Sequence, residues 1–144
     1  MAGISNVAKL TGLRGRWETV NQTPKVVCDT GHNVGGWTYL SRQLADVQCQ
    51  QMHIVFGMVD DKDIDKVLDL LPKYAKFYFT KAQTKRALNE SIVMAKAKEH
   101  GIEGKAYPTV NEAYKAAFRS ASANDFIFVG GSSYVVGDFL TNCM

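Results

Sequence analysis

The feature that most constrains the fold of this chain is the alternation of short apolar runs with segments of helical periodicity. The apolar runs are KVVCD, MHIVFGMV, KFYFTK, GKAYP and DFIFVGG, and they recur roughly every 25 residues. Between them, apolar residues stand at helical spacing in four sets: Leu40, Leu44 and Val47; Ile64, Val67, Leu68 and Leu71; Leu88, Ile92 and Ala95; and Ala113, Tyr114, Ala117 and Phe118. This alternation predicts βαβ units, and therefore an α/β fold with a mainly parallel sheet and helices on both faces.

Four local signals refine this prediction. The apolar runs are nearly continuous, which is typical of strands buried on both faces. The segment GRWETVNQ alternates more, and we expect it to form an antiparallel edge strand. Thr109 and Glu112 have the spacing of a capping box, and Gly101 is expected directly after the end of the third helix.

Composition narrows the class of protein. The 144 residues are expected to form one domain, residues 1–144, with ordinary fractions of hydrophobic (46%) and charged (22%) residues. A net charge of +3 gives no reason to expect nucleic acid or a membrane surface as a partner. Cys28, Cys49 and Cys143 show no CxxC spacing, which argues against a zinc site and a disulfide framework. With no apolar run long enough for a bilayer and no signal-like start, we expect a cytoplasmic location.

Polar residues follow four of the predicted strands. The four groups are Asp29, Thr30, Gly31, His32 and Asn33; Gly57, Met58, Asp60, Asp61, Lys62 and Asp63; Thr80, Lys81, Lys85 and Arg86; and Gly130, Gly131, Ser132 and Ser133. In open α/β sheets, ligands bind outside the carboxyl ends of the strands. We therefore expect these groups to converge on one edge of the sheet and to form a site for a polar ligand.

Each group also has a purely structural interpretation. Asp29 could be a turn or helix-capping residue, and the acids of DDKD suit a solvated helix start. Asp29 and His32 could ligate a metal, but a third ligand at usable spacing is missing. The glycines of GGSS permit a turn that a serine caps, and neither Ser132 nor Ser133 matches the GxSxG motif of a hydrolase nucleophile.

Two common phosphate-binding motifs are missing from the sequence. It contains no GxxxxGK[ST] loop, and no GxGxxG follows the first strand. Any nucleotide chemistry therefore needs further groups supplied from elsewhere.

Taken in order, the motifs resemble the C-terminal domain of folylpolyglutamate synthase, in the dihydrofolate synthase/folylpolyglutamate synthase branch of the Mur ligase superfamily. GLRGRWE is similar to the opening motif of that domain, CDTGHNVGG to its D-G/T-A/G-H-N segment, and FGMVDDKD to its G-x-x-x-D-K-D segment. KRAL resembles its R-A-L segment, and VGGSSYVVGDF its final G-S-x-Y-x-V-G-E. The resemblance extends from about Leu10 to Leu140. Thr30-Gly31 and Asp138 depart from the usual residues without removing a functional group.

The resemblance implies roles for five residues. Arg16 would reach the phosphates of ATP, and Asp29 would hold the nucleotide through the ribose hydroxyls. His32 and Asn33 would lie beside the reacting phosphate and the acceptor substrate, and Ser132 near the folate glutamate or the incoming glutamate. No metal ligand is implied in this chain. Lys62, Asp63 and Arg86 match motif positions without an assigned role.

The resemblance also implies an activity, partners and an architecture. The fold would be a Rossmann-like Mur ligase C-terminal domain, and the reaction an ATP-dependent ligation of L-glutamate to folate through an acyl phosphate. Dihydrofolate synthesis from dihydropteroate would be a second activity in a bifunctional parent. The P-loop and the Mg²⁺ ligands would lie in a linked N-terminal ATPase domain, which is absent from this sequence.

Two other functions remain open from the residues alone. One is a stand-alone, non-catalytic α/β module that binds a nucleotide or another small ligand. The other is a metal-dependent hydrolase built around Asp29 and His32, which would require a stoichiometric metal.

Overall fold

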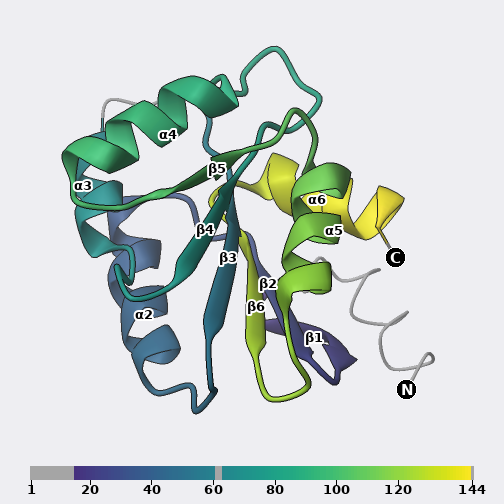
Figure 1. The fold of residues 1–144 in the computed structure, drawn as a ribbon. Coiled ribbons are helices and arrows are strands. Elements are labelled where there is room, and N and C mark those ends of the chain that lie inside the picture. Colours follow the sequence, from purple (N-terminus) through teal and green to yellow (C-terminus); the bar gives the residue numbers. More distant parts are fainter. Residues whose placement is uncertain (1–14, 61–62, 144) are drawn as a thin grey trace.

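A computed structural model of the chain describes residues 15–60 and 63–143, and it contains a six-stranded sheet between two layers of helices (Figure 1). The strands are β1 (Glu18–Gln22), β2 (Lys25–Asp29), β3 (Met52–Phe56), β4 (Lys76–Phe79), β5 (Gly104–Ala106) and β6 (Phe126–Gly130). Their order in the sheet is β1-β2-β6-β3-β4-β5. All neighbouring strands are parallel except β1, which pairs with β2 in antiparallel orientation. The expected α/β fold, the parallel sheet and the antiparallel edge strand are confirmed.

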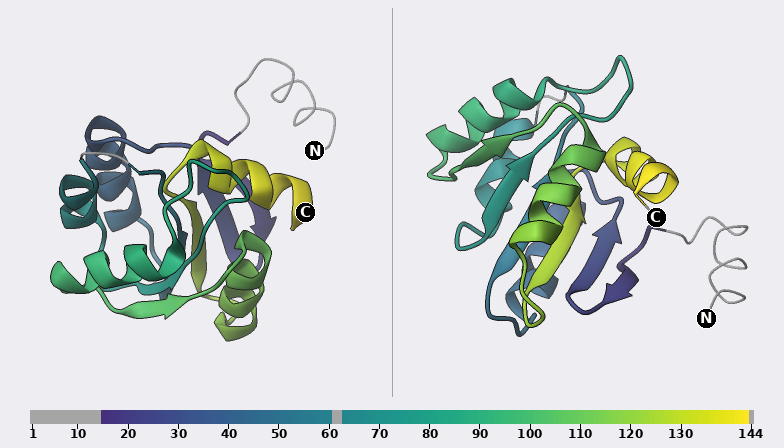
Figure 2. Two further views of the ribbon diagram at one scale, coloured as in Figure 1. Left: turned by 90° about the horizontal axis from the view of Figure 1, so that it is seen from above. Right: turned by 45° about the vertical axis from the view of Figure 1, so that its right-hand side comes forward.

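Five described helices cover the sheet on both faces. They are α2 (Val34–Ala45), α3 (Ile64–Leu70), α4 (Glu90–Glu99), α5 (Val110–Ser120) and α6 (Ser133–Asn142). Figures 1 and 2 show α2, α3 and α4 on one face and α5 and α6 on the other. The two faces of the sheet therefore bury two separate apolar layers.

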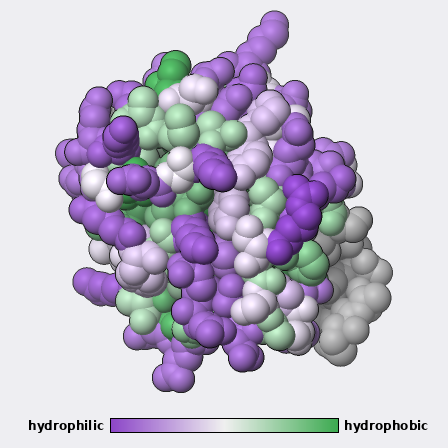
Figure 3. Space-filling view, in the orientation of Figure 1, coloured by the Kyte–Doolittle hydropathy of each residue, from purple (hydrophilic) through white to green (hydrophobic). Residues whose placement is uncertain are grey.

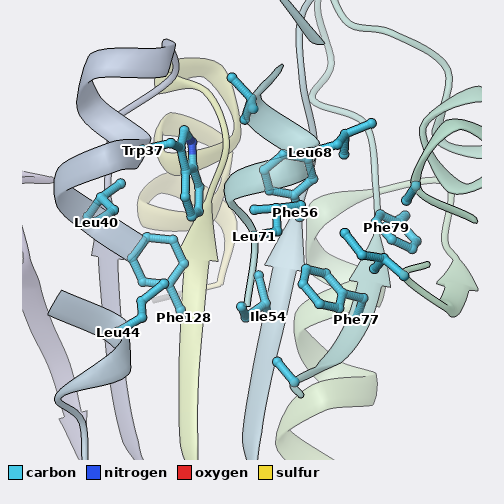
Figure 4. Packing of buried hydrophobic residues seen from close by; sticks show 14 of the residues in the cluster. Trp37, Leu40, Leu44, Ile54, Phe56, Leu68, Leu71, Phe77, Phe79 and Phe128 are labelled. Atoms are coloured by element: carbon cyan, nitrogen blue, oxygen red, sulfur yellow. The ribbon is translucent and has the colours of Figure 1, made fainter. Parts of the chain in front are cut away.

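The larger apolar layer lies under α2, α3 and α4 (Figure 4). Trp37 of α2 is fully buried there, with its ring edge-on to Phe56 of β3 and Phe128 of β6, at centroid distances of 5.7 Å in both pairs. The opposite layer joins Val26, Cys28, Val55, Ile127 and Val129 of the strands to the apolar sides of α5 and α6. Because adjacent residues of one strand point into different layers, the central strands β3 and β6 are almost continuously apolar, and His53 of β3 is a buried polar exception.

The helix predictions were right in position and partly wrong in detail. The apolar face predicted for the third helix, α4, is wrong. Ile92 of that predicted face is 47% exposed, and α4 buries Val93 and Ala97 instead. Val47 lies beyond the end of α2, although it still packs against the larger apolar layer. The capping prediction at α5 is confirmed, since the Thr109 hydroxyl accepts a hydrogen bond from the Glu112 amide at 3.1 Å.

The face of the molecule shown in Figure 3 is predominantly polar. Figure 3 shows hydrophilic side chains over most of one face, with hydrophobic ones gathered toward its middle. Across residues 15–60 and 63–143, none of the helices has both the length and the apolar character needed to cross a bilayer.

Candidate functional site

The carboxyl ends of four strands lie side by side at one edge of the sheet. Asp29 at the end of β2 is level with Gly130 at the end of β6, and Gly130 is level with Phe56 of β3. Phe56 is in turn level with Phe79 of β4. The polar groups that follow these strands are therefore brought to one edge, as the sequence predicts. Lys62 and Asp61 lie outside the described residues.

Asp29 ties together two segments at this edge. Its Oδ2 accepts a hydrogen bond from the amide of Trp17 at 2.9 Å, and its Oδ1 accepts one from the amide of Gly31 at 2.8 Å. The amide of Thr30 donates to the carbonyl of Gly15 at 2.8 Å. The turn before β1 is thus fastened to the turn after β2, and Arg16 lies in the fastened segment.

The turn that carries Arg16 has an unusual backbone. Gly15 has a φ of 88° and Trp17 a φ of 45°, so both residues that flank Arg16 are in the left-handed region. For a bulky aromatic residue such as Trp17, that conformation costs on the order of 1–3 kcal/mol. Its ring lies against Phe126 and Phe128 of β6, with centroids 6.1 Å away in each case. The Arg16 side chain is exposed between these anchored neighbours.

His32 and Asn33 occupy the turn between β2 and α2. Asn33 is the N-cap of α2, and its Oδ1 accepts a hydrogen bond from the Gly36 amide at 2.8 Å. His32 is exposed, with Nδ1 3.3 Å from the carbonyl oxygen of Thr30. The polar end of this turn therefore faces solvent beside the positive end of the α2 dipole.

These groups line a common cavity of about 420 Å³. Its walls include Arg16, Trp17, Asp29, His32, Asn33 and Tyr39. An arginine and a helix N-terminus on one side favour phosphate oxygens, and a carboxylate can accept hydrogen bonds from hydroxyls. The arrangement is therefore suited to a phosphorylated ligand that also carries hydroxyl groups.

The cavity is also lined by residues that were not predicted as site residues, namely Trp17, Gly36, Tyr39, Leu40 and Gln43. Tyr39 is 66% exposed, and it belongs to a helix whose buried side was easier to recognise than the side that lines the cavity. For Trp17, the only sign in the sequence that it belongs to the site was its position next to Arg16. The backbone conformation of Trp17 depends on Asp29, twelve residues later in the chain.

The other predicted residues lie elsewhere on the carboxyl edge. Ser132 is only 3% exposed and caps α6, with Oγ accepting a hydrogen bond from the Val135 amide at 3.1 Å. It follows β6 and does not line the cavity around Asp29. Asp63 occupies the N-cap position of α3, and Arg86 is exposed, with its carbonyl oxygen accepting from the Asp60 amide at 3.2 Å.

Metal ligation has little support in the described part of the chain. No three His, Cys, Asp or Glu side chains there gather closely enough to hold a metal ion. Asp29 also uses both of its carboxylate oxygens to accept backbone hydrogen bonds. A hydrolase built on Asp29 and His32 is therefore not supported by this geometry.

Comparison with known proteins gives a consistent result. Residues 15–133 match the family model described as Mur ligase, glutamate ligase domain. The dihydrofolate synthase/folylpolyglutamate synthase of Buchnera aphidicola (Schizaphis graminum) is 29% identical over 138 residues, which cover 95% of this chain and 32% of the relative. The E. coli enzyme of the same name is 31% identical over 126 residues, or 86% of this chain and 29% of that protein. This chain thus spans about a third of the length of these curated relatives.

Two of the solved structures similar to this chain contain a nucleotide. E. coli FolC in complex with DHPP and ADP superimposes with a TM-score of 0.79 at 28% identity, covering 88% of this chain and 30% of that one. A bifunctional folylpolyglutamate synthase/dihydrofolate synthase with Mn, AMPPNP and L-glutamate bound gives a TM-score of 0.76 at 26% identity. The match covers 92% of this chain and 32% of that structure.

Proposed function

This chain belongs to the Mur ligase glutamate ligase domain family, and from that membership we propose that it is the glutamate ligase domain of an ATP-dependent folylpolyglutamate synthase. The observation that carries the proposal is the single cavity that joins Arg16, Asp29, His32 and Asn33 at the carboxyl edge of the sheet. Its donors suit phosphate and its carboxylate suits ribose hydroxyls. Dihydrofolate synthase activity is a second activity of the proposed parent, as it is in the names of the relatives.

The proposed reaction forms an amide in two steps. A carboxylate oxygen of the folate substrate attacks the γ-phosphorus of ATP, which gives an acyl phosphate and ADP. The amine of L-glutamate then attacks the acyl carbon, phosphate leaves, and the amine loses a proton. The protein contributes to such a transfer mainly through positioning and electrostatic stabilisation.

Each site residue has a specific part in this proposal. Arg16 binds phosphate oxygens of ATP with its planar guanidinium. Asp29 accepts hydrogen bonds from the ribose through the lone pairs that its backbone contacts leave available. His32 and Asn33, both exposed at the cavity, lie beside the reacting phosphate and the acceptor. Ser132, at the end of β6, lies toward the folate glutamate or the incoming L-glutamate.

A second domain completes the proposed enzyme. This sequence has no P-loop, and the described residues offer no metal-ligand set, so we assign phosphate cradling and Mg²⁺ binding to a linked N-terminal ATPase domain. The substrates are then bound between the two domains, where closure excludes water from the acyl phosphate. Three cysteines without disulfide spacing support a cytoplasmic location for the whole protein.

Arginine substitution in the enzyme that contains this chain tests the proposal. If the Arg16 contact strengthens as charge develops on the transferring phosphoryl group, Arg16→Ala should lower kcat by about 10²–10³-fold. Arg16→Lys should recover only part of the loss, because an ammonium group does not reproduce the fork of donors. Steady-state kinetics with ATP varied at saturating folate and glutamate would measure both effects.

The exposed Arg42 provides a matched control, since it lies on α2 but does not line the cavity. Arg42→Ala should leave kcat and the KM for ATP unchanged. Unaltered kinetics in Arg16→Ala would show that the turn before β1 has no part in catalysis.

A further inference from the structure

We propose that Asp29 is a positioning residue for Arg16: its carboxylate fixes the turn of residues 15–17 in the geometry that presents the Arg16 side chain to nucleotide phosphates. This inference rests on the proposed contact between Arg16 and phosphate. It gives Asp29 a role beyond accepting hydrogen bonds from ribose.

The contacts around Asp29 provide the first step of the argument. One carboxylate oxygen holds the amide of Trp17, directly after Arg16, and the other holds the amide of Gly31, directly before His32. The two turns that contribute cationic and polar groups to the cavity are therefore joined through one side chain. A hydrogen bond to a charged acceptor is roughly twice as strong as a neutral one, which suits a carboxylate to this function.

The backbone of the turn provides the second step. A tryptophan with a φ of 45° does not hold this conformation through its own preference, so the surrounding structure must hold it. The stacking of the Trp17 ring on β6 fixes the side chain, whereas the bond to Asp29 fixes the amide. Without that bond, only the Gly15 carbonyl, held by the Thr30 amide, and the packed Trp17 ring restrain the turn. We therefore expect the Arg16 side chain to be presented less consistently to the cavity.

A phosphate probe without ribose separates positioning from a direct contact. Inorganic tripolyphosphate has no ribose, so the loss of a ribose contact with Asp29 cannot affect its binding. Removal of a nearby negative charge should by itself strengthen the binding of a polyanion. Weaker binding after substitution of Asp29 is therefore opposite in sign to the direct electrostatic effect, and it reports the loss of Arg16 positioning.

The experiment measures tripolyphosphate affinity by calorimetry in the 144-residue chain and its variants. Arg16→Ala should weaken binding about tenfold or more, as expected for a charge-assisted contact. Asp29→Ala should weaken it by a similar factor, and the double variant should be no weaker than Arg16→Ala alone. The exposed Asp46, the C-cap of α2, supplies the charge control, because Asp46→Ala should not weaken binding.

Hydrogen exchange provides a readout that does not depend on a ligand. The Trp17 amide should exchange faster in Asp29→Ala, while amides of the central strand β6 keep their protection. Asp29→Asn retains one acceptor oxygen and the original volume, so it should show smaller changes in exchange and affinity. It also replaces Asp29→Ala in the comparison if the alanine variant does not fold.

The outcomes distinguish this inference from the proposed function. Binding that Arg16→Ala weakens but Asp29→Ala leaves unchanged or strengthens would overturn the positioning role alone. Failure of the parental chain to bind tripolyphosphate would overturn the phosphate contact of Arg16, and the inference with it.

Discussion

His53 lies on β3 with only 1% of its surface exposed, and both of its ring nitrogens have hydrogen-bond partners. Nε2 is 2.8 Å from Oδ2 of Asp125, and Nδ1 is 2.8 Å from the hydroxyl of Tyr78. The amide and hydroxyl of Ser122 also donate to the Asp125 carboxylate. Burial raises the pKa of Asp125, but the hydrogen bonds from His53 and Ser122 outweigh it and leave that pKa below its usual value.

Asp125→Ala should therefore destabilise the fold. It leaves the buried imidazole of His53 without its acceptor, which costs about 1–3 kcal/mol. Because the folded-state pKa of Asp125 is lowered, its contribution is present above the unfolded value of about 3.9 and is lost as the pH falls through the folded value. Urea unfolding at neutral and acidic pH measures both effects. Asp46→Ala, at an exposed position, should change stability by less than about 0.5 kcal/mol.

At the scale of elements, the turn from β6 into α6 depends on a glycine. Gly131 has a φ of 110°, and a Cβ placed there would lie 2.2 Å from the carbonyl oxygen of Gly57 at the end of β3. Two strand ends therefore approach each other too closely for any side chain, which keeps the carboxyl edge of the sheet compact.

Gly131→Ala should destabilise the protein by at least about 1–3 kcal/mol, because it combines a backbone penalty with a steric clash. Gly137 in the middle of α6 is the matched control, since among the described residues no atom outside the adjacent helix backbone lies within 4 Å of a Cβ built there. Gly137→Ala should stabilise the helix by up to about 1 kcal/mol. Chemical denaturation of both variants would test the contrast, and equal effects would contradict the close approach of β3 and β6.

Helices α3 and α4 are joined by an ionic cluster. His100, the C-cap of α4, contacts the carboxylates of Asp65 and Asp69 on α3. The hydrogen bonds with Asp65 and Asp69 raise the pKa of His100, and the hydrogen bond with His100 lowers the pKa of Asp65. Both carboxylates are more than 60% exposed, so solvent and salt screen the cluster.

His100→Gln should lower the melting temperature slightly at pH 5.5 and have a smaller effect at pH 9. The raised pKa of His100 means that its contribution is complete below the unfolded value of about 6.5 and is lost as the pH rises through the folded value. The lowered pKa of Asp65 means that the cluster also weakens as the pH falls below about 3.9. Lys98→Gln, which removes another cation from the last turn of α4, is the control. A difference that grows at pH 9 would contradict this assignment.

At the scale of the whole molecule, one sheet separates two apolar layers, and each central strand contributes to both. The 144-residue chain should therefore unfold in a single thermal transition with a mixed α/β circular dichroism spectrum.

The 144-residue chain should neither hydrolyse ATP nor ligate glutamate by itself, because it has no P-loop. Calorimetry and a phosphate-release assay would test these expectations. ATP turnover that Asp29→Ala abolishes would contradict the assignment of phosphate cradling to another domain.

The sequence by itself determined the elements of this fold and the strand ends at which the candidate site lies. Apolar runs and helical spacing are local patterns, so β2 could be located to the residue and Thr109 could be identified as a cap. The same periodicity misassigned the buried side of α4, because packing against the sheet, rather than the stripe in the sequence, selected Val93 and Ala97. The convergence of the strand ends followed from the predicted parallel sheet.

Only the tertiary structure decided the relations between distant segments. The insertion of β6 between β2 and β3, the burial of His53 beside Asp125, and the left-handed turn at Trp17 all depend on contacts between residues far apart in the chain. No local pattern encodes such contacts, because each is stabilised by a partner that folding brings into place. Asp29 shows the difference: the sequence placed its carboxylate at a strand end, and the structure showed that this carboxylate holds the turn that carries Arg16.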